Sequence, residues 1–392
     1  MARARSRRRI LLAPNAFKGT FDPVEVAEIW RAALETERGV EVDARPLSDG
    51  GDGFLGVVRH YRPRVLEVRA RVRDPLGRPI AAAWGWDLGT GAAYVESAAA
   101  IGLHLIAAAE RRPLEATSEG LGMLLKVVAA LGPARIAVGL GGSATVDGGL
   151  GAARALGFRF EDARGRSIEQ PGALERLRRI TPPPVPPLAG PRIVALTDVG
   201  HPLLGERGAA AVFGSQKGAD PDAVKRLEAG LARLAERWRA DLGAPEDLVG
   251  RPGAAAAGGL AAGLVAFVGA VLEPGPAWCG RLARFGPALS AADAVLTGEG
   301  RFDAQSERGD KGTGWVIEQA LRVGVPVAVV CAEADTRARA RLRTRGVVTV
   351  TRSALPSRRV GGRAADLLGA PDLAFLAREA LDRLGALRLG RT

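Results

Sequence analysis

The chain has few of the residues that build disulfide frameworks or zinc sites. Only two of its 392 residues are cysteine and only three are histidine. Two cysteines, Cys279 and Cys331, cannot make a disulfide framework in a chain this long, and their scarcity predicts a reducing compartment, the cytoplasm. The three histidines lie far apart in the sequence, never at the spacing of metal ligands, which argues against a zinc site.

Long apolar runs are also missing. One uncharged stretch, 252–272, has the length of a membrane span and contains a GxxxG pair, Gly259 and Gly263. It consists mainly of alanine and glycine, however, and is only weakly apolar. We interpret it as a buried, tightly packed helix preceded by a glycine-rich loop, and we expect no contact with a membrane.

Lysine is scarce, although the chain is strongly basic. The formal net charge is +12, and only five of the 55 basic residues are lysine. Five arginines fall within the first nine residues, and the other arginines are scattered among acidic residues. Because a nucleic-acid-binding surface needs a clustered basic footprint, we expect no nucleic-acid partner and interpret the start as a solvated tail.

Glycine, by contrast, is abundant. It accounts for 52 of 392 residues, about twice the usual share of roughly 7%. Such an excess is expected in turns, in loops that approach a ligand closely and in tightly packed helices. The remaining composition, 47% hydrophobic and 25% charged, is typical of a globular protein, and the length predicts one large domain or two ordinary ones.

Both ends of the chain alternate strand and helix patterns. A helix opening at Asp22-Pro23, with Glu25 at its third position, has the signature of a capped N-terminus. Short apolar runs predict five strands, with helices between them. These strands are 10–13, 40–45, 294–297, 327–330 and 347–350. Together they predict a doubly wound parallel α/β sheet built from residues 1–60 and 290–392.

The middle of the chain, 61–289, reads as a second α/β domain inserted into the first. The runs 81–86 and 92–95 suggest a hairpin, and a helix over 118–131 precedes a strand at 136–138. A further strand is expected at 193–196, and a helix with a narrow apolar stripe opens at Asp220-Pro221.

Charged residues follow several of the predicted strands. In open parallel sheets, ligands bind beyond the carboxyl ends of the strands. Three of the five lysines, Lys18, Lys217 and Lys311, stand directly before a glycine, where a compact ammonium and nearby backbone N–H groups suit phosphate. The alternative is an ordinary surface turn, which we favour for Lys311. The other candidates at strand ends are Asp49, Asp198, Glu299, Gly300, Arg301 and Asp303.

The segment 139–149 is a glycine-rich loop. Five glycines with Ser143, Thr145 and Asp147 follow a predicted strand and supply N–H groups, hydroxyls and one carboxylate. Such a loop could cradle a phosphate or a small polyol acid, with purely structural glycines as the alternative. Gly139-x-Gly141-x-x-Ala144 is only a loose dinucleotide fingerprint, because no ribose-binding acid follows at the end of a second strand about twenty residues later. A Walker A motif is absent, because no Gly-Lys dipeptide occurs.

These residue types favour phosphoryl transfer over acyl transfer. Phosphoryl transfer needs oxygen ligands for Mg²⁺, a base near the attacking hydroxyl and cations for the transferred group. Acyl transfer is not favoured, because the chain has no Gly-x-Ser-x-Gly elbow and no well-placed histidine base. For each carboxylate taken singly, a role as a turn or cap residue is the alternative.

Five segments, in this order, resemble the signature segments of the bacterial glycerate kinase family. They are 13–19, 46–53, 141–149, 213–218 and 297–305. The resemblance implies a kinase that uses ATP and Mg²⁺ to phosphorylate D-glycerate, usually to 2-phosphoglycerate. It also implies a flavodoxin-like domain interrupted by a second α/β domain. The state of assembly, monomer or homodimer, stays open.

Under this resemblance we assign hypothetical roles to the candidate residues. The catalytic set is Lys18, Asp49, Asp198 and Arg301. Lys18 and Arg301 would neutralise phosphates, or Arg301 would hold the substrate carboxylate. Asp49 or Asp198 would accept the hydroxyl proton, and Glu299 or Asp198 would hold Mg²⁺. The residues expected to bind substrate or phosphate are Gly141, Gly142, Ser143, Asp147, Lys217 and Gly300.

The chain departs from the family pattern at several of these segments. It has Asn15-Ala16 where members usually carry Asp-Ser, Asp52 in place of Glu and Val146 in place of Asn, and its lysine near position 311 is shifted or lost. Two alternatives therefore stay open: a kinase for another small hydroxy acid, and an inactive paralogue that binds a nucleotide or metabolite as a sensor.

Overall fold

The chain folds into two compact units. A computed structural model describes residues 7–186, 188–303, 306, 311–354 and 368–389. The first unit comprises Met1–Tyr61 and Gly275–Thr392, and the second comprises Arg62–Pro274.

The chain returns from the second unit to the first at Gly275, earlier than residue 290, where the sequence predicts the boundary. Helices α9 (Gly275–Leu282) and α10 (Phe285–Ser290) belong to the first unit. There α9 packs against α2 (Phe54–Tyr61) and α12 (Gly312–Val323), with the rings of Phe54 and Trp278 5.7 Å apart. These contacts link residues that are distant in sequence, so no local pattern marks the boundary.

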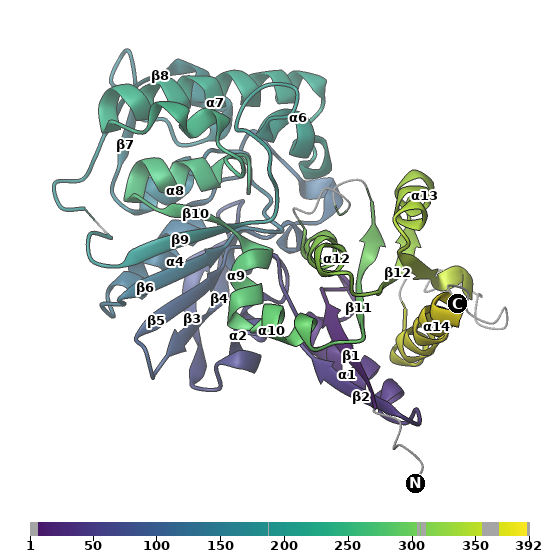
Figure 1. Cartoon of the computed structure of the whole chain (residues 1–392). Coiled ribbons are helices and arrows are strands. Elements are labelled where there is room, and N and C mark those ends of the chain that lie inside the picture. The colour runs from purple at the N-terminus through teal and green to yellow at the C-terminus, as the bar shows by residue number, and fades with distance from the viewer. Residues whose placement is uncertain (1–6, 187, 304–305, 307–310, 355–367, 390–392) are drawn as a thin grey trace, which may run out of the picture. The chain divides into compact units, whose positions relative to one another are not determined.

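A five-stranded parallel sheet forms the centre of the first unit. Its strands are β1 (Arg8–Pro14), β2 (Val40–Ala44), β11 (Ala294–Phe302), β12 (Val327–Ala334) and β13 (Val348–Thr351). Figure 1 labels all of these strands except β13. Their spatial order is β13-β12-β11-β1-β2, and every neighbouring pair is parallel. All five predicted strands are confirmed. Counted along the chain the order reads 2-1-3-4-5, one of the common doubly wound orders.

Helices cover this sheet on both faces. On one face, α1 (Pro23–Leu34) and α14 (Ala370–Leu389) pack side by side over alternate strand residues such as Leu12, Leu296 and Val330. On the other face α12 contacts β1, β11 and β12 through buried residues outside that cluster. The remaining long helix of the unit is α13 (Thr336–Thr344). Asp22 caps α1 as predicted, accepting from the N–H groups of Val24 and Glu25.

The second unit is built on a mixed six-stranded sheet of order β10-β9-β6-β5-β4-β3. Its strands are β3 (Val65–Arg73), β4 (Pro79–Asp87), β5 (Ala92–Glu96), β6 (Arg135–Gly139), β9 (Arg192–Thr197) and β10 (Val271–Pro274). The expected hairpin is confirmed as the antiparallel pair β4–β5. The apolar pattern does not predict β3, because charged residues alternate along this edge strand at Glu67, Arg69 and Arg71, and such charges protect an exposed edge.

Six helices and a two-stranded sheet complete the second unit. They are α3 (Ala98–Ile101), α4 (Glu119–Ala129), α5 (Leu150–Ala155), α6 (Ala209–Phe213), α7 (Pro221–Leu242), α8 (Leu260–Val268), β7 (Arg159–Asp162) and β8 (Leu177–Thr181). The stretch 252–272 contains turns, then α8, then part of β10, and residues 260–264 of α8 are buried. No helix among the described residues is long and apolar enough to cross a bilayer.

Candidate active site

The first group of candidate residues lies where the order of the five-stranded sheet reverses. The chain leaves β1 toward β2 on one side, and β11 lies on the other side. Loops beyond such a pair of strands diverge and leave a crevice, the usual ligand site of open α/β sheets. Here a cavity of about 350 Å³ is lined by residues that include Lys18, Glu299, Gly300, Arg301 and Asp303.

A second, smaller cavity of about 20 Å³ adjoins the first through shared lining residues. Its lining includes Asp49 and Asp52 from the segment after β2. Four residues line both cavities: Ala16, Lys18, Glu299 and Lys311. The structure therefore brings Lys18, Asp49, Glu299, Gly300 and Arg301 together, as their positions after the strands suggested.

Strand β11 is longer than the sequence indicated. We expected it to end at Thr297, but it continues to Phe302 because β12 runs beside it, with Glu299 opposite Cys331 and Arg301 opposite Glu333. Residues two apart on a strand share a face. Glu299 and Arg301 are thus held on one side of a sheet instead of in a free loop.

The Glu299 carboxyl is partly shielded from water. Its Oε1 is buried and has no hydrogen-bond partner among the residues that the structure describes. Burial raises the pKa of Glu299 to about 7, although the charge of Lys311 and the Ser306 hydroxyl act to lower it. An unpartnered carboxylate oxygen at a cavity is a good ligand for a cation.

Lys311, for which the sequence favours an ordinary surface turn, lines both cavities. Its side chain is only 18% exposed, and Nζ lies 3.9 Å from Asp303 Oδ1. It stands at the start of α12, whose first turn is brought to the cavities by packing on β1 and β11. Its only sequence signal was the adjacent glycine, the same signal that marked Lys18.

Asn15 fixes the start of α12 beside the smaller cavity. With its side-chain amide rotated, Oδ1 accepts from Thr313 N–H at 3.0 Å and Nδ2 donates to Leu47 O at 3.3 Å. A Cβ added to Gly312 would lie within 2.5 Å of the Asn15 amide group, so a larger residue there would force Asn15 to shift. Asn15, one of the departures from the family pattern, therefore links its own loop to the segments that contain Leu47 and Thr313.

The second group of candidates lies in the glycine loop after β6. The carboxylate of Asp147 is fully buried, and its hydrogen bonds are to groups of the protein itself. Its Oδ2 accepts from the N–H and the hydroxyl of Ser118 at 2.8 Å and from Gly151 N–H at 3.0 Å. Its Oδ1 accepts from Gly149 N–H at 3.0 Å. These four bonds tie the loop to the starts of α4 and α5.

Lys217 is buried beside the same loop. Its Nζ donates to Ser143 Oγ at 3.1 Å and to Thr145 O at 2.8 Å. Burial lowers the pKa of Lys217 to about 8, and the charges of Asp147 and Asp198 partly oppose this. The structure thus brings Ser143, Asp147, Asp198 and Lys217 into one electrostatic cluster.

Much of the glycine excess serves close packing around this loop. A Cβ on Gly258 would lie 2.0 Å from Thr145 O, and a Cβ on Gly263 would lie 2.2 Å from Gly148 O. Gly142 adopts the left-handed conformation, with φ of 73°. Gly258 and Gly263, in the segment that carries α8, therefore have a structural role, because they allow close backbone contact with the glycine loop. This contact holds the backbone of the loop in place.

The comparisons with known proteins agree with the five collinear segments. The profile of the glycerate kinase family matches residues 10–370. The chain belongs to this family. It is similar to a glycerate kinase of Halalkalibacterium halodurans, at 36% identity over 82% of this chain and 84% of that protein.

Two further relatives support the assignment. A protein of Escherichia coli K12 named glycerate 2-kinase is 36% identical over 77% of this chain and 79% of its own length. A crystal structure of a candidate glycerate kinase 2 from Salmonella typhimurium LT2 matches 98% of this chain and 99% of that chain, with a TM-score of 0.75 and 32% identity. As a glycerate kinase family member the chain is an enzyme, and a kinase family implies ATP as the phosphoryl donor.

Proposed function

We propose that this glycerate kinase family member transfers the γ-phosphoryl group of ATP to D-glycerate, with 2-phosphoglycerate as the product. The cavity at the sheet reversal carries the proposal, because Lys18, Arg301 and Lys311 line it together with the partly shielded carboxyl of Glu299. Phosphoryl transfer is catalysed mainly by such positioning and by cations that offset the charge of the transferred group. The name of the Escherichia coli relative favours the 2-phospho product.

In this proposal the first unit handles the phosphates. Lys18 and Arg301 neutralise phosphate oxygens, with capture of the substrate carboxylate as the alternative role of Arg301. Gly300, which lines the same cavity, binds a phosphate oxygen through its backbone in this proposal. Asp49 accepts the proton of the attacking hydroxyl. The alternative base, Asp198, belongs to the second unit, where its charge acts on Lys217.

The donors present also fit a Mg²⁺ ion. Mg²⁺ in kinases takes one or two protein carboxylates and completes its shell with phosphate oxygens and water. Glu299 offers such a carboxylate, since its Oε1 has no hydrogen-bond partner in the described part of the chain. Asp198 is the alternative ligand. When bound, the ion would offset the charge that develops on the transferred group.

The second unit, in this proposal, orients the substrate. The Ser143 hydroxyl and the N–H groups of Gly141 and Gly142 bind glycerate oxygens. Lys217 was expected to touch phosphate, but its contacts with Ser143 Oγ and Thr145 O support a different role, in which it orients the serine. Asp147 likewise acts by holding the loop backbone, since its four hydrogen bonds are internal.

For the fold we propose a flavodoxin-like domain interrupted by an inserted α/β domain. The 2-1-3-4-5 strand order supports the first part. The return of the chain to the first unit at Gly275 supports the second.

An assay with ATP, Mg²⁺ and D-glycerate tests the function directly. We expect ADP formation that depends on D-glycerate, with phosphorus NMR placing the new phosphate on the 2-hydroxyl. A folded protein that shows no turnover would refute the glycerate assignment.

One observation favours a second candidate function, a kinase for another small hydroxy acid. Ala16 lines both cavities, where family members usually carry a serine, so a hydroxyl is missing there. A panel of small hydroxy acids would show whether another substrate is preferred. Tight ATP binding without ADP formation from any of them would instead indicate an inactive, nucleotide-sensing paralogue.

A further inference from the structure

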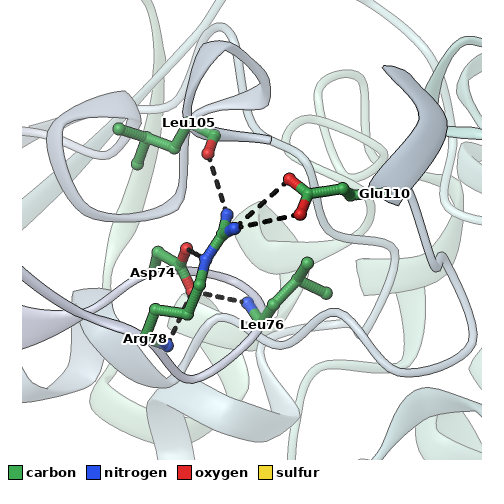
Figure 2. A network of polar contacts seen from close by, with 5 residues as sticks. All are labelled: Asp74, Leu76, Arg78, Leu105 and Glu110. Carbon is green, nitrogen blue, oxygen red and sulfur yellow. Dashed lines mark hydrogen bonds and ion pairs between the residues drawn. The ribbon is translucent and has the colours of Figure 1, made fainter. Parts of the chain in front are cut away.

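A single arginine remote in sequence from the candidate residues connects separate segments of the second unit (Figure 2). Arg78 follows the turn between β3 and β4. Its guanidinium donates to Asp74 Oδ2 through Nε, to Leu105 O at 3.0 Å through Nη2, and to Glu110 at 3.2 Å through Nη1. Arg78 thereby links the β3–β4 turn to the segment 102–111.

The turn that presents Arg78 is itself rigidly held. Asp74 is only 2% exposed, and its Oδ1 accepts from the N–H groups of Leu76 and Arg78 at 2.9 Å. The Asp74 N–H donates to Arg78 O at 2.8 Å. A buried carboxylate with all these bonds is costly to displace, so the turn is a firm support for the arginine.

The segment 102–111 needs such support because it has little regular structure. It contains only two short 3₁₀ turns, Leu103–Leu105 and Ala108–Glu110. Yet backbone bonds place it directly against the glycine loop. Leu103 N–H donates to Gly142 O at 2.8 Å, and Gly102 forms a bridge with Ser143. Immediately before the segment, Ile101 O at the end of α3 accepts from Ala144 N–H at 2.8 Å. These bonds hold the backbone on both sides of Ser143.

The same segment also holds the chain next to Lys217. Arg111 Nη1 donates to Gln216 O at 2.9 Å. A Cβ on Gly218 would lie 2.8 Å from Arg111 Cβ, so the two backbones approach closely. Segment 102–111 thus contacts the two chain segments whose side chains meet in the Lys217–Ser143 hydrogen bond.

We propose that Arg78 is a positioning residue that sets the place of the Ser143 hydroxyl through segment 102–111. The inference rests on the proposed function, in which Ser143 and the neighbouring N–H groups bind the substrate. Without the guanidinium, segment 102–111 loses its bonds at Leu105 and Glu110, and the backbone bonds beside Ser143 open more often.

The test compares Arg78→Met with Arg71→Met in the full chain. Methionine keeps much of the aliphatic stem. Arg71 is an exposed residue on the same hairpin, and its side chain has no ion pair or hydrogen bond to the described residues. We expect hydrogen exchange of the Leu103 and Ala144 amides to accelerate about tenfold in Arg78→Met, the equivalent of one hydrogen bond. The KM for D-glycerate should rise by a similar factor while the KM for ATP changes little, and Arg71→Met should match the wild type.

Each other result has a distinct meaning. Unchanged exchange at both amides overturns the inference, and so does acceleration that is equally large in α7, because that would show general destabilisation. Faster exchange at the two amides with an unchanged KM for D-glycerate supports the positioning but removes Ser143 from substrate binding, which counts against the proposed function alone. Should Arg78→Met fail to fold, Glu110→Gln applies the same test, since it leaves the Asp74 turn intact.

Discussion

At the scale of single residues, the first unit's cavity is governed by a balance of charge and burial. Lys18, Arg301 and Lys311 supply positive charge, and the charge of Lys311 acts to lower the pKa of Glu299. Burial has the larger effect and raises the pKa of Glu299 to about 7, because desolvation disfavours the ionised carboxyl. A cation bound at Glu299 would reverse that effect, which is what a metal ligand in a kinase requires.

Lys18→Ala tests the role of the lysine in the cavity. Removing a cation that stabilises the transferred phosphoryl group should lower kcat/KM by about a hundredfold or more. Steady-state kinetics with ATP and D-glycerate measure it. The matched control is Lys225→Ala on α7, whose side chain is 78% exposed. Equal activity of Lys18→Ala and the control would remove Lys18 from the catalytic set.

Lys217 predicts a specific dependence of stability on pH. Burial holds its pKa at about 8, below the ordinary 10.5, so between these values the folded state binds fewer protons than the unfolded state. The free energy of unfolding contributed by this group therefore rises with pH across that window. At about 1.4 kcal/mol per pKa unit, the rise amounts to up to about 3 kcal/mol.

The measurement is urea unfolding of the wild type and Lys217→Met at several pH values between about 7 and 10.5. Other groups titrate alike in both proteins, so the difference between their free energies of unfolding at each pH reports the contribution of Lys217. We expect the wild type to gain stability relative to the variant as the pH rises. Parallel curves would show that Lys217 is ordinarily solvated in the folded protein.

At the scale of elements, helix α8 and the glycine loop depend on each other through close backbone contact. Gly263 lies within α8, where alanine would normally favour the helix by about 1 kcal/mol. Its added Cβ, however, would lie 2.2 Å from Gly148 O. We expect Gly263→Ala to lower the free energy of unfolding by about 2 kcal/mol or more, because neither backbone can move without disturbing the loop.

Gly286→Ala in α10 is the control for that variant. It is also a helical glycine, but a Cβ there meets nothing within 4 Å. Urea unfolding of this variant should show unchanged or slightly higher stability. If both variants behaved alike, the contact between α8 and the glycine loop would not be tight.

Elements with a strong local pattern were predictable, and those formed by partners distant in sequence were not. The capping residues Asp22 and Asp220 both cap helices as their sequence patterns indicated. Strand β3 was missed because charged residues alternate along an exposed edge, and β10 because it follows the apolar residues of α8. The extension of β11 through Arg301 depends on pairing with β12, which no local pattern in 294–303 reveals.

At the scale of the whole molecule, the net charge of +12 predicts little about partners. Many of its arginines are held in local ion pairs with acids, such as Arg237 with Asp241 and Arg251 with Asp247. We therefore expect no retention on duplex DNA at physiological salt, where nonspecific binding depends on a concentrated positive surface. An electrophoretic shift or fluorescence anisotropy experiment measures this. Submicromolar binding under those conditions would contradict it.

The sequence by itself determined the five-stranded parallel sheet, the family and most candidate residues, because these depend on strand periodicity and on motifs read along the chain. Tertiary structure decided the surroundings of those residues. It buries Asp147 and Lys217 against the glycine loop, adds Lys311 to the cavity lining, and bonds Arg78 to Leu105 O. The physical reason is that burial and hydrogen-bond partners set the state of a charged side chain, and here those partners come from segments remote in the sequence.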